Sequence, residues 1–394
     1  MVGDPATSKA LRSYLYVASY TYPNIAPGSS TVSDAHGISV FEVFNDGSVE
    51  LIQVAECENP SFLTVNNDQT MLYCVNELGV DDTELLGRVS AFRIDQSNGK
   101  LAFLNTQSTA GNWPCHCQVH SSGRYLLTAN YGSQNFIVHA LLKDGSLGEM
   151  VDAYQNSSNG SGPEHNRQSA SHPHMMLTNP GGQHVFGVDL GTDQVLSWSL
   201  DIHSGKLTPG EVPSANVASG SGSRHMVFHP DDQQAYVLNE LSSTIDVFDF
   251  DAIRGAFIWK QSASTLPEET DLVRPQFDAS NPGLVPSGSN TGGEICIDPS
   301  GRFVYSSNRG GNTIAIFKVN QLNGKLSALD WVSTGGINPR GMQMEPGGKY
   351  LFVGNQSSNN ITVFEINAEN GLLDSPINDV ACPVPTDFAF KTIS

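Results

Sequence analysis

Six copies of one two-strand pattern, and the two halves of a seventh, run through this chain. In each of the six, a short apolar stretch begins 16 residues before an Asn or Asp that ends a second apolar stretch. The opening and closing residues are Pro60 and Asn76, Pro114 and Asn130, Pro173 and Asp189, Ser223 and Asn239, Gly292 and Asn308, and Pro339 and Asn355. Two apolar stretches joined by turn residues are typical of a β-hairpin, so the sequence predicts one hairpin repeated six times.

Each predicted hairpin is followed by a third strand, a turn that contains Gly, and a fourth strand. The stretch STIDVFDFDAIRGAFIWK shows this arrangement, and NTIAIFKVNQLNGKLSAL repeats it. Repeats of about 40 to 50 residues with four strands each are typical of the blades of a β-propeller. Such blades cannot bury both faces alone, and therefore they stack around a common axis.

The seventh copy is divided between the two ends of the chain. Residues 14–20 and 37–52 supply strands near the N-terminus, and residues 383–390 (PVPTDFAF) match the missing opening strand. Pairing of the two ends closes a ring and removes the exposed sheet edges of a linear array. The expected fold is all-β: a seven-bladed propeller of four-stranded blades, in a single domain of residues 1–394 with residues 1–13 as an N-terminal extension.

The charge of the chain restricts its partners. It has 40 acidic and 20 basic residues and a net charge of −20, whereas nucleic acids and anionic membrane surfaces attract clustered Lys and Arg. No apolar run is long enough to span a membrane. We therefore expect neither nucleic acid nor a membrane as a partner, and the sequence gives no indication of the oligomeric state.

The N-terminus and the cysteines bear on location. The chain starts without an apolar segment ahead of a small-residue cleavage site. Its six cysteines have no framework spacing, which is typical of thiols in a reducing compartment. We therefore expect a cytoplasmic protein.

The repeat also predicts which residues share one mouth of the central channel. In each hairpin, the residue after the opening residue and the residue after the closing one lie at the same open end. The first set is Ser61, Cys115, His174, Arg224, Gly293, Arg340 and Thr386, and the second set is Glu77, Tyr131, Leu190, Glu240, Arg309, Gln356 and Tyr20. Three arginines at these positions are a high share of only 20 basic residues.

Two long irregular connections are expected on the same side, at residues 154–171 and 265–291. Long loops in a compact domain are usually functional or disordered. We interpret these two as lids or specificity loops, with disorder as the alternative.

Each charged mouth residue has a functional and a structural interpretation. Arg224 and Glu240 belong to one hairpin and form either part of a site or a structural ion pair. His174 is a general acid or base with a pKa near neutrality, or a hydrogen-bonded filler. Arg309 is a ligand-binding or a solvated turn residue, and Arg340 contacts substrate or braces a blade.

The stretch WPCHCQVH contains three potential zinc ligands in Cys115, His116 and Cys117. Adjacent residues of a strand point to opposite faces, and no second pair with zinc spacing follows. Phosphate-loop, dinucleotide and GxSxG patterns are absent where their flanking strand and helix are needed. We therefore predict no metal site and no cofactor.

Four stretches, SHPHMM, SRHMVFHPDDQQAYVLNELSST, DPSGRFVYSSNRGGNTIAIF and NPRGMQMEPGGKYLFVGNQSSNNITVF, together resemble the seven-bladed lactonase family. This family includes propeller-type 6-phosphogluconolactonases and fungal 3-carboxy-cis,cis-muconate lactonizing enzymes. The resemblance extends over about residues 14–390. It implies functional roles for His174, Arg224, Glu240 and Arg309, which the repeat geometry also selects.

The resemblance implies a lactone hydrolase that acts on a small molecule, a sugar lactone similar to 6-phosphogluconolactone. Glu240 or His174 would activate water, while Arg224 and Arg309 would stabilise the oxyanion or hold an acidic group. We expect further substrate contacts from Arg340, Glu77, Tyr131, His225, Gln356 and His172. Because Arg224 lies close, the pKa of Glu240 should be lowered.

Three other functions stay open. The first is an intramolecular lyase of the carboxymuconate cyclase type, in which arginines hold carboxylates. The second is a calcium-dependent hydrolase that uses Glu77, Glu240, Glu294 and Asp387, although neighbouring arginines repel a cation. The third is a propeller scaffold without catalytic activity, against which the charged mouth argues.

Overall fold

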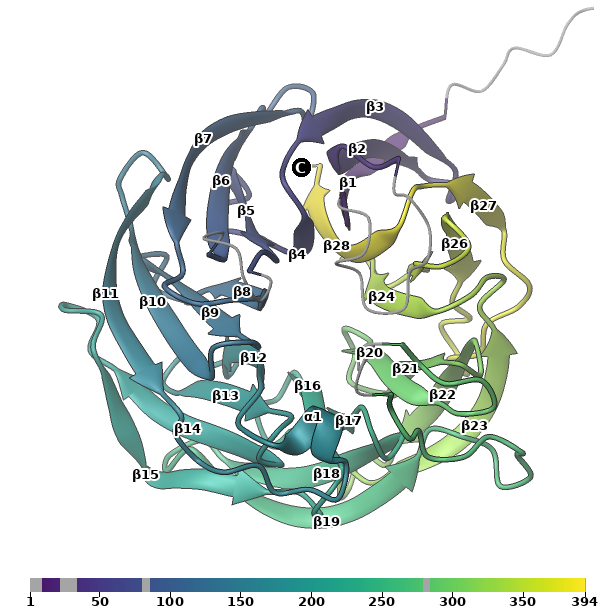
Figure 1. Ribbon diagram of the computed structural model, residues 1–394. Helices are drawn as coiled ribbons and strands as arrows, with labels where there is room; N and C mark the ends of the chain where they lie inside the picture. The colour runs from purple at the N-terminus through teal and green to yellow at the C-terminus, as the bar shows by residue number, and fades with distance from the viewer. Residues whose placement is uncertain (1–8, 22–33, 80–85, 279–283, 394) are drawn as a thin grey trace, which may run out of the picture.

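The computed structural model describes residues 9–21, 34–79, 86–278 and 284–393. In this part of the chain, 28 strands form seven antiparallel four-stranded sheets, which surround a common axis (Figure 1). The prediction of an all-β, seven-bladed propeller is confirmed. The one helix described, α1 (His165–Gln168), is far too short to cross a membrane.

The innermost strand of each blade lies next to the axis. These strands are β4 (Pro60–Val65), β8 (Pro114–Val119), β12 (Pro173–Thr178), β16 (Ser223–Phe228), β20 (Thr291–Ile297), β24 (Pro339–Met344) and β28 (Pro385–Thr392). The second strands are β1 (Leu11–Ser19), β5 (Met71–Asn76), β9 (Tyr125–Asn130), β13 (Val185–Asp189), β17 (Gln234–Asn239), β21 (Phe303–Arg309) and β25 (Tyr350–Asn355).

The two outer strands complete each blade. The third strands are β2 (Gly37–Phe44), β6 (Arg88–Ile94), β10 (Asn135–Leu141), β14 (Gln194–Leu200), β18 (Thr244–Asp251), β22 (Thr313–Val319) and β26 (Asn360–Glu365). The fourth strands are β3 (Val49–Glu56), β7 (Leu101–Ser108), β11 (Leu147–Gln155), β15 (Leu207–Asn216), β19 (Ala256–Ser264), β23 (Leu326–Ser333) and β27 (Asn378–Ala381).

The core lies between neighbouring blades. Tyr236 and Val247 of one blade, for example, pack in the same buried cluster as Val304 and Phe317 of the next. The second strands are buried along almost their whole length, because each is covered by the blades on both sides. Stacking of blades therefore supplies the burial that one sheet cannot supply alone.

The two ends of the chain meet in one blade, as predicted. Strand β28 pairs antiparallel with β1, with Leu15 opposite Phe390 and Tyr16 opposite Ala389, and the two strands lie side by side in Figure 1. The predicted extension of residues 1–13 is wrong at its end, since β1 already begins at Leu11. Arg12 lies at a bulge of this strand, between the paired residues Leu11 and Ser13, and its guanidinium forms an ion pair of 2.5 Å with the buried Glu345 of the neighbouring blade.

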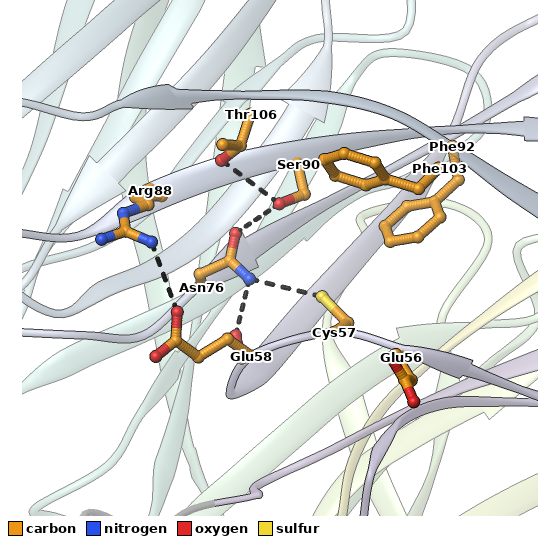
Figure 2. Close-up of a pocket in the computed structure, with 9 residues that line it drawn as sticks. All are labelled: Glu56, Cys57, Glu58, Asn76, Arg88, Ser90, Phe92, Phe103 and Thr106. Carbon is orange, nitrogen blue, oxygen red and sulfur yellow. Dashed lines mark hydrogen bonds and ion pairs between the residues drawn. The ribbon is translucent and has the colours of Figure 1, made fainter.

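The closing Asn of the repeat holds the chain segment that enters its blade. Figure 2 shows Asn76, whose Nδ2 donates to the Glu58 carbonyl at 2.6 Å and to the Cys57 Sγ at 3.3 Å. Equivalent bonds run from Asn130 to the Thr109 carbonyl (3.0 Å), from Asn308 to that of Thr265 (2.7 Å) and from Asn355 to that of Thr334 (3.3 Å). A buried amide thus satisfies a carbonyl that no strand pairs.

Asp189 occupies the closing position of the third hairpin, where its carboxylate accepts hydrogen bonds instead of donating them. A carboxylate only accepts, so Asp189 receives the backbone N–H groups of His172 (2.8 Å) and Gly191 (3.0 Å). The side chains of Asn156 and Ser171 also donate to it. One closing position therefore accepts either residue, provided that the entering segment offers the matching groups.

The two long connections are shorter than predicted, because Tyr154 and Gln155 belong to β11 and Thr291 belongs to β20. Helix α1 lies in the first connection and close to β16 and β17 near the ring centre in Figure 1. The two connections contact each other, since the Asn166 Nδ2 donates to the Phe277 carbonyl at 2.8 Å. Residues 279–283 of the second connection lie outside the described residues.

Candidate active site

A bulge in each innermost strand sets the positions of the first predicted set. In β16, Ser223 pairs with Asn239 and His225 pairs with Leu238, so that Arg224 has no partner in register. The same irregularity leaves out Ser61, Cys115, His174, Arg340 and Thr386, while in β20 it covers both Gly293 and Glu294. Bulges re-aim side chains, and here they do so at the same end of every blade, which we call the mouth.

Backbone hydrogen bonds fix the second set at the same end. The N–H of Glu240 donates to the Gly222 carbonyl at 2.7 Å, and that of Glu77 donates to the Asn59 carbonyl at 3.0 Å. Tyr131, Leu190, Gln356 and Tyr20 make the corresponding bonds to Trp113, His172, Asn338 and Val384. Each residue therefore leaves its second strand beside the start of the innermost strand.

Three arginines surround the carboxylate of Glu240. Its Oε1 lies 2.7 Å from Arg167 Nη2, and its Oε2 lies 2.8 Å from Arg309 Nη2 and 3.2 Å from Arg224 Nε. Glu240 is only 2% exposed, and all three arginines are buried. We call these four residues the Glu240 cluster.

Burial and charge act in opposite directions on Glu240. Burial raises the pKa of this carboxyl, but Arg167, Arg309 and Arg224 together outweigh burial and hold the pKa well below its usual range. Glu240 is therefore ionised at neutral pH, as the sequence predicted. Burial, together with Arg224, Arg340 and Arg167, lowers the pKa of Arg309 to about 10, against the opposing effect of Glu240.

His174 lies beside this cluster. Its Nε2 is 4.0 Å from Glu240 Oε2, and its Nδ1 is 3.9 Å from the Cys115 Sγ. Burial, and then the charge of Arg224, lower the pKa of His174 well below its usual value. The expectation that His174 titrates near neutrality is therefore wrong, because the packing around the mouth excludes water from the ring. At neutral pH the imidazole is unprotonated.

A second ion pair lies across the mouth. The Tyr20 hydroxyl donates to Glu77 Oε2 at 2.7 Å, and Arg340 Nη2 lies 3.7 Å from the same oxygen. The Arg340 guanidinium also stands over the Tyr20 ring, 5.2 Å from its centroid. These contacts join three blades. Gln356, which is 2% exposed, has an amide Nε2 with no hydrogen-bond partner among the described residues.

A deeper layer lies one residue further along the innermost strands. The His225 Nδ1 is 2.7 Å from Glu294 Oε1, and its ring packs edge-on against Phe62 and His116. Glu294 Oε2 lies 3.9 Å from Arg224 Nη1, which also donates to the Gly293 carbonyl and lies 3.2 Å from His225 Nδ1. His225, predicted to bind substrate, thus pairs with the carboxylate that supports Arg224 from below.

Tyr131 and His172 are stacked at the mouth, with ring centroids 4.4 Å apart. The Tyr131 hydroxyl accepts a hydrogen bond from Arg167 Nε at 3.0 Å, and its ring lies edge-on to His174. A ring nitrogen of His172 lies 3.0 Å from the Tyr131 carbonyl. The pair therefore positions Arg167 and borders His174.

The three potential zinc ligands of WPCHCQVH lie in different surroundings. Cys115 contacts His174, His116 packs on Phe62 with centroids 4.2 Å apart, and Cys117 is buried among the apolar side chains of two blades. Within the described ranges, no group of three or more His, Cys, Asp or Glu residues is arranged to hold a metal ion.

A separate hollow lies at the outer part of the blade formed by β4 to β7 (Figure 2). Its polar groups bond to one another: Ser90 donates to Asn76 Oδ1 at 2.7 Å, and Arg88 lies 3.3 Å from Glu58. These bonds stabilise the blade. Among the residues that line the hollow, no carboxylate is surrounded by several arginines as Glu240 is.

Comparison with known proteins identifies the family of this chain. A family model described as "Lactonase, 7-bladed beta-propeller" matches residues 14–390. The chain belongs to this lactonase family. The resemblance carried by the four sequence stretches is confirmed.

Similar proteins include enzymes named for lactones. The 6-phosphogluconolactonase of Bacillus subtilis is 34% identical over 316 residues, which are 79% of this chain and 82% of that protein. That of Formosa agariphila is 28% identical over 315 residues, 78% and 82% of the two chains. The structure of the periplasmic gluconolactonase of Pseudomonas aeruginosa has a TM-score of 0.85 and 28% identity, and it covers 98% of this chain and 100% of that one.

The sequence did not predict two residues of this candidate site, Arg167 and Glu294. Arg167 lies in a long connection outside the repeat, so counting along the hairpins does not reach it; the length of the connection was the only signal. The sequence pattern indicated Glu294 only as a potential calcium ligand. It lies deeper because the bulge of β20 contains two residues where the other hairpins have one.

Proposed function

We propose that the mouth hydrolyses the internal ester of a sugar lactone that carries an anionic group, with a substrate similar to 6-phosphogluconolactone. Support comes from the family, from the relatives named as 6-phosphogluconolactonases, and from the buried arginines. Arginine forks pair with phosphate and carboxylate groups. The substrate is a small molecule, as the lactonase family implies.

The proposal rests on one observation: an unprotonated His174 lies 4.0 Å from an ionised Glu240. His174 accepts a proton from water as the water oxygen attacks the lactone carbonyl carbon. The carboxylate of Glu240 stabilises the resulting imidazolium. We assign to Glu240 the stabilisation of charge, because three arginines keep its proton affinity low.

Arg224 stabilises the oxyanion that forms on the carbonyl oxygen, because its Nε lies 3.2 Å from the same Glu240 oxygen that lies 4.0 Å from His174 Nε2. The intermediate collapses when the bond from the carbonyl carbon to the ring oxygen breaks. His174 returns its proton to that oxygen, which becomes a hydroxyl group, and the product is a hydroxy acid. Arg309 holds the anionic group of the substrate.

The proposed activity is tested with freshly prepared lactones and the full chain, after subtraction of spontaneous hydrolysis. We expect turnover of 6-phosphoglucono-1,5-lactone that survives complete chelation of divalent cations. Loss of activity on chelation supports a calcium-dependent hydrolase. Turnover of a carboxymuconate without turnover of lactones supports a lyase, and the absence of any turnover supports a scaffold.

We infer that the protein works in a reducing compartment, the cytoplasm. All six cysteines are free, although the Sγ atoms of Cys57 and Cys74 are only 3.5 Å apart. The similar Pseudomonas aeruginosa protein is described as periplasmic, so location within the family needs its own measurement. Cell fractionation with thiol trapping should find the protein and its free thiols in the cytosol; a periplasmic signal contradicts this inference.

A further inference from the structure

The Glu240 cluster contains more positive charge than its carboxylate neutralises. Three guanidinium groups share Glu240, and Glu294 offers a second carboxylate to Arg224 alone, at 3.9 Å. Among the described residues, no carboxylate except Glu240 lies within 4.0 Å of Arg167 or Arg309. Burial of unpaired charge is unfavourable, so the cluster is incomplete without a further anion.

Arg167 and Arg309 also keep free hydrogen-bond donors. Arg167 uses Nε for the Tyr131 hydroxyl and Nη2 for Glu240, while Arg309 uses Nε and Nη2 for the Gly292 carbonyl and Glu240. The Nη1 of either side chain has no partner in the described part of the chain. Two guanidinium groups on opposite oxygens of one carboxylate thus remain able to bind a second oxyanion.

The position of Arg167 is fixed although it lies in a long connection. The neighbouring Gln168 donates to the Leu190 carbonyl and to Asp193, both at 2.9 Å, and Asn166 bonds to the Phe277 carbonyl. The Phe277 ring covers the Arg167 guanidinium at 4.8 Å. Cation–π contact and aromatic packing hold the charge in place without neutralising it.

We propose that Arg167 is a specificity residue, which binds the phosphate group of the substrate together with Arg309 at the point where the two long connections meet. This inference rests on the proposed function and adds the residue that selects a phosphorylated lactone over a neutral one. When the phosphate binds, Arg167 and Arg309 share their charge between the phosphate and Glu240. The carboxylate of Glu240 then interacts more strongly with the His174 imidazolium.

The test compares two variants on three substrates. Arg167→Gln removes the charge at the cluster, and Arg274→Gln removes an arginine of the other long connection, whose contact is the Gly220 carbonyl. The substrates are 6-phosphoglucono-1,5-lactone, the neutral glucono-1,5-lactone, and glucaro-1,4-lactone, which carries a carboxylate. The comparison measures kcat/KM for each pair, with thermal melting to verify folding.

Loss of a charge-assisted hydrogen bond predicts a fall of about 10- to 100-fold for Arg167→Gln on the phosphorylated lactone, and at most about 3-fold on the neutral one. Arg274→Gln should keep the wild-type ratio between the two. An equal loss on both substrates overturns the inference, because Arg167 is then structural. A larger loss on the carboxylate lactone than on the phosphorylated one overturns the choice of phosphate.

A second measurement tests the inference in case Arg167→Gln does not fold. Inorganic phosphate, added to the wild-type protein, should accelerate hydrolysis of the neutral lactone, and Tyr131→Phe should weaken that effect because Arg167 loses its hydroxyl partner. Absence of acceleration overturns the inference. If the wild-type protein hydrolyses none of the lactones, the proposed function itself fails, and this outcome is distinct from the others.

Discussion

The single negative charge of Glu240 is surrounded by three positively charged arginines, and these contacts determine how the charged groups of the site are arranged. It lies between a blade arginine from its own hairpin, one from the next blade, and one from a long connection. Its depressed pKa contributes stability above the usual pKa of about 4.5, and this contribution is lost as the pH falls through the lowered value. The cluster therefore depends on an ionised Glu240.

Replacement of Glu240 by Gln should destabilise the fold as well as abolish activity. Removal of one partner leaves three arginines buried without their carboxylate, which typically costs about 3–5 kcal/mol. Chemical denaturation at pH 7 measures the loss. The control Glu211→Gln removes the partner of the exposed Arg254 and should change nothing measurable. Equal stability of both variants contradicts the account of the cluster.

His174 should act as a base well below neutral pH. Burial and Arg224 lower its pKa, so it stays unprotonated through neutrality, and kcat/KM should fall only when the pH drops below the usual histidine range. In His174→Asn this acid limb should disappear and the rate should be low at every pH. A pH-rate profile decides, and a limb that survives in the variant excludes His174 as the base.

At the residue scale, the sequence predicted that His174, Arg224, Glu240 and Arg309 lie close together, because the period of the repeat places each of them at the mouth end of its blade. It did not predict the protonation of His174, which depends on how tightly neighbouring blades exclude water. Arg167 lies outside the period. No count along the chain connects it with Glu240.

At the scale of elements, the closing Asn links the blade to the segment that enters it in four hairpins, whereas Asn239 donates to Thr244 and Asp246 of its own blade. The six predicted pairs of opening and closing residues are all opposite one another in the structure, because the hairpin length fixes the register. The first and last residues of the strands were less predictable than the pairing of the hairpins. Strand β1 already starts at Leu11, because Leu11 pairs with Phe44 and Ser13 pairs with Thr392 at the far end of the sequence.

Asn308→Asp should therefore destabilise the fifth hairpin although it changes almost no volume. The buried Asn308 Nδ2 donates to the Thr265 carbonyl at 2.7 Å and to the Thr313 hydroxyl at 3.1 Å. The carbonyl keeps a second bond, from Trp331 Nε1 at 2.8 Å, but an aspartate oxygen cannot donate and would face the carbonyl oxygen without a partner. An unsatisfied buried group costs about 1–3 kcal/mol. Denaturant titration checks this value against Asn323→Asp at an exposed turn, which should be neutral. A neutral Asn308→Asp contradicts the role given to the repeat.

At the scale of the whole molecule, the ring depends on its termini. Strand β28 is the innermost strand of a blade whose other strands come from the N-terminus, and its residues also contact β4 and β24. A protein with a net charge of −20 thus keeps a buried positive cluster at one end of a closed ring. The closed ring fixes the distances between arginines from separate blades.

Deletion from Pro383 onward should abolish cooperative unfolding, because it removes β28, exposes the edge of β1, and uncovers β4 and β24 of the neighbouring blades. Calorimetric melting of the truncated chain measures this effect. Removal of Ile393 and Ser394 alone serves as the control and should preserve the transition. A cooperative transition at the wild-type temperature after the long deletion contradicts closure of the ring.

The most direct test of the account is the value of kcat/KM for 6-phosphoglucono-1,5-lactone in the wild-type protein and in Arg224→Lys. Lysine keeps the charge but not the fork that stabilises the oxyanion, so we expect a loss of about 2–4 kcal/mol of transition-state stabilisation, or roughly 30- to 900-fold. Arg88→Lys, in the hollow of Figure 2, should retain wild-type activity. Wild-type activity in Arg224→Lys, or an equal loss in Arg88→Lys, would contradict the claim that the mouth of the ring opens the lactone.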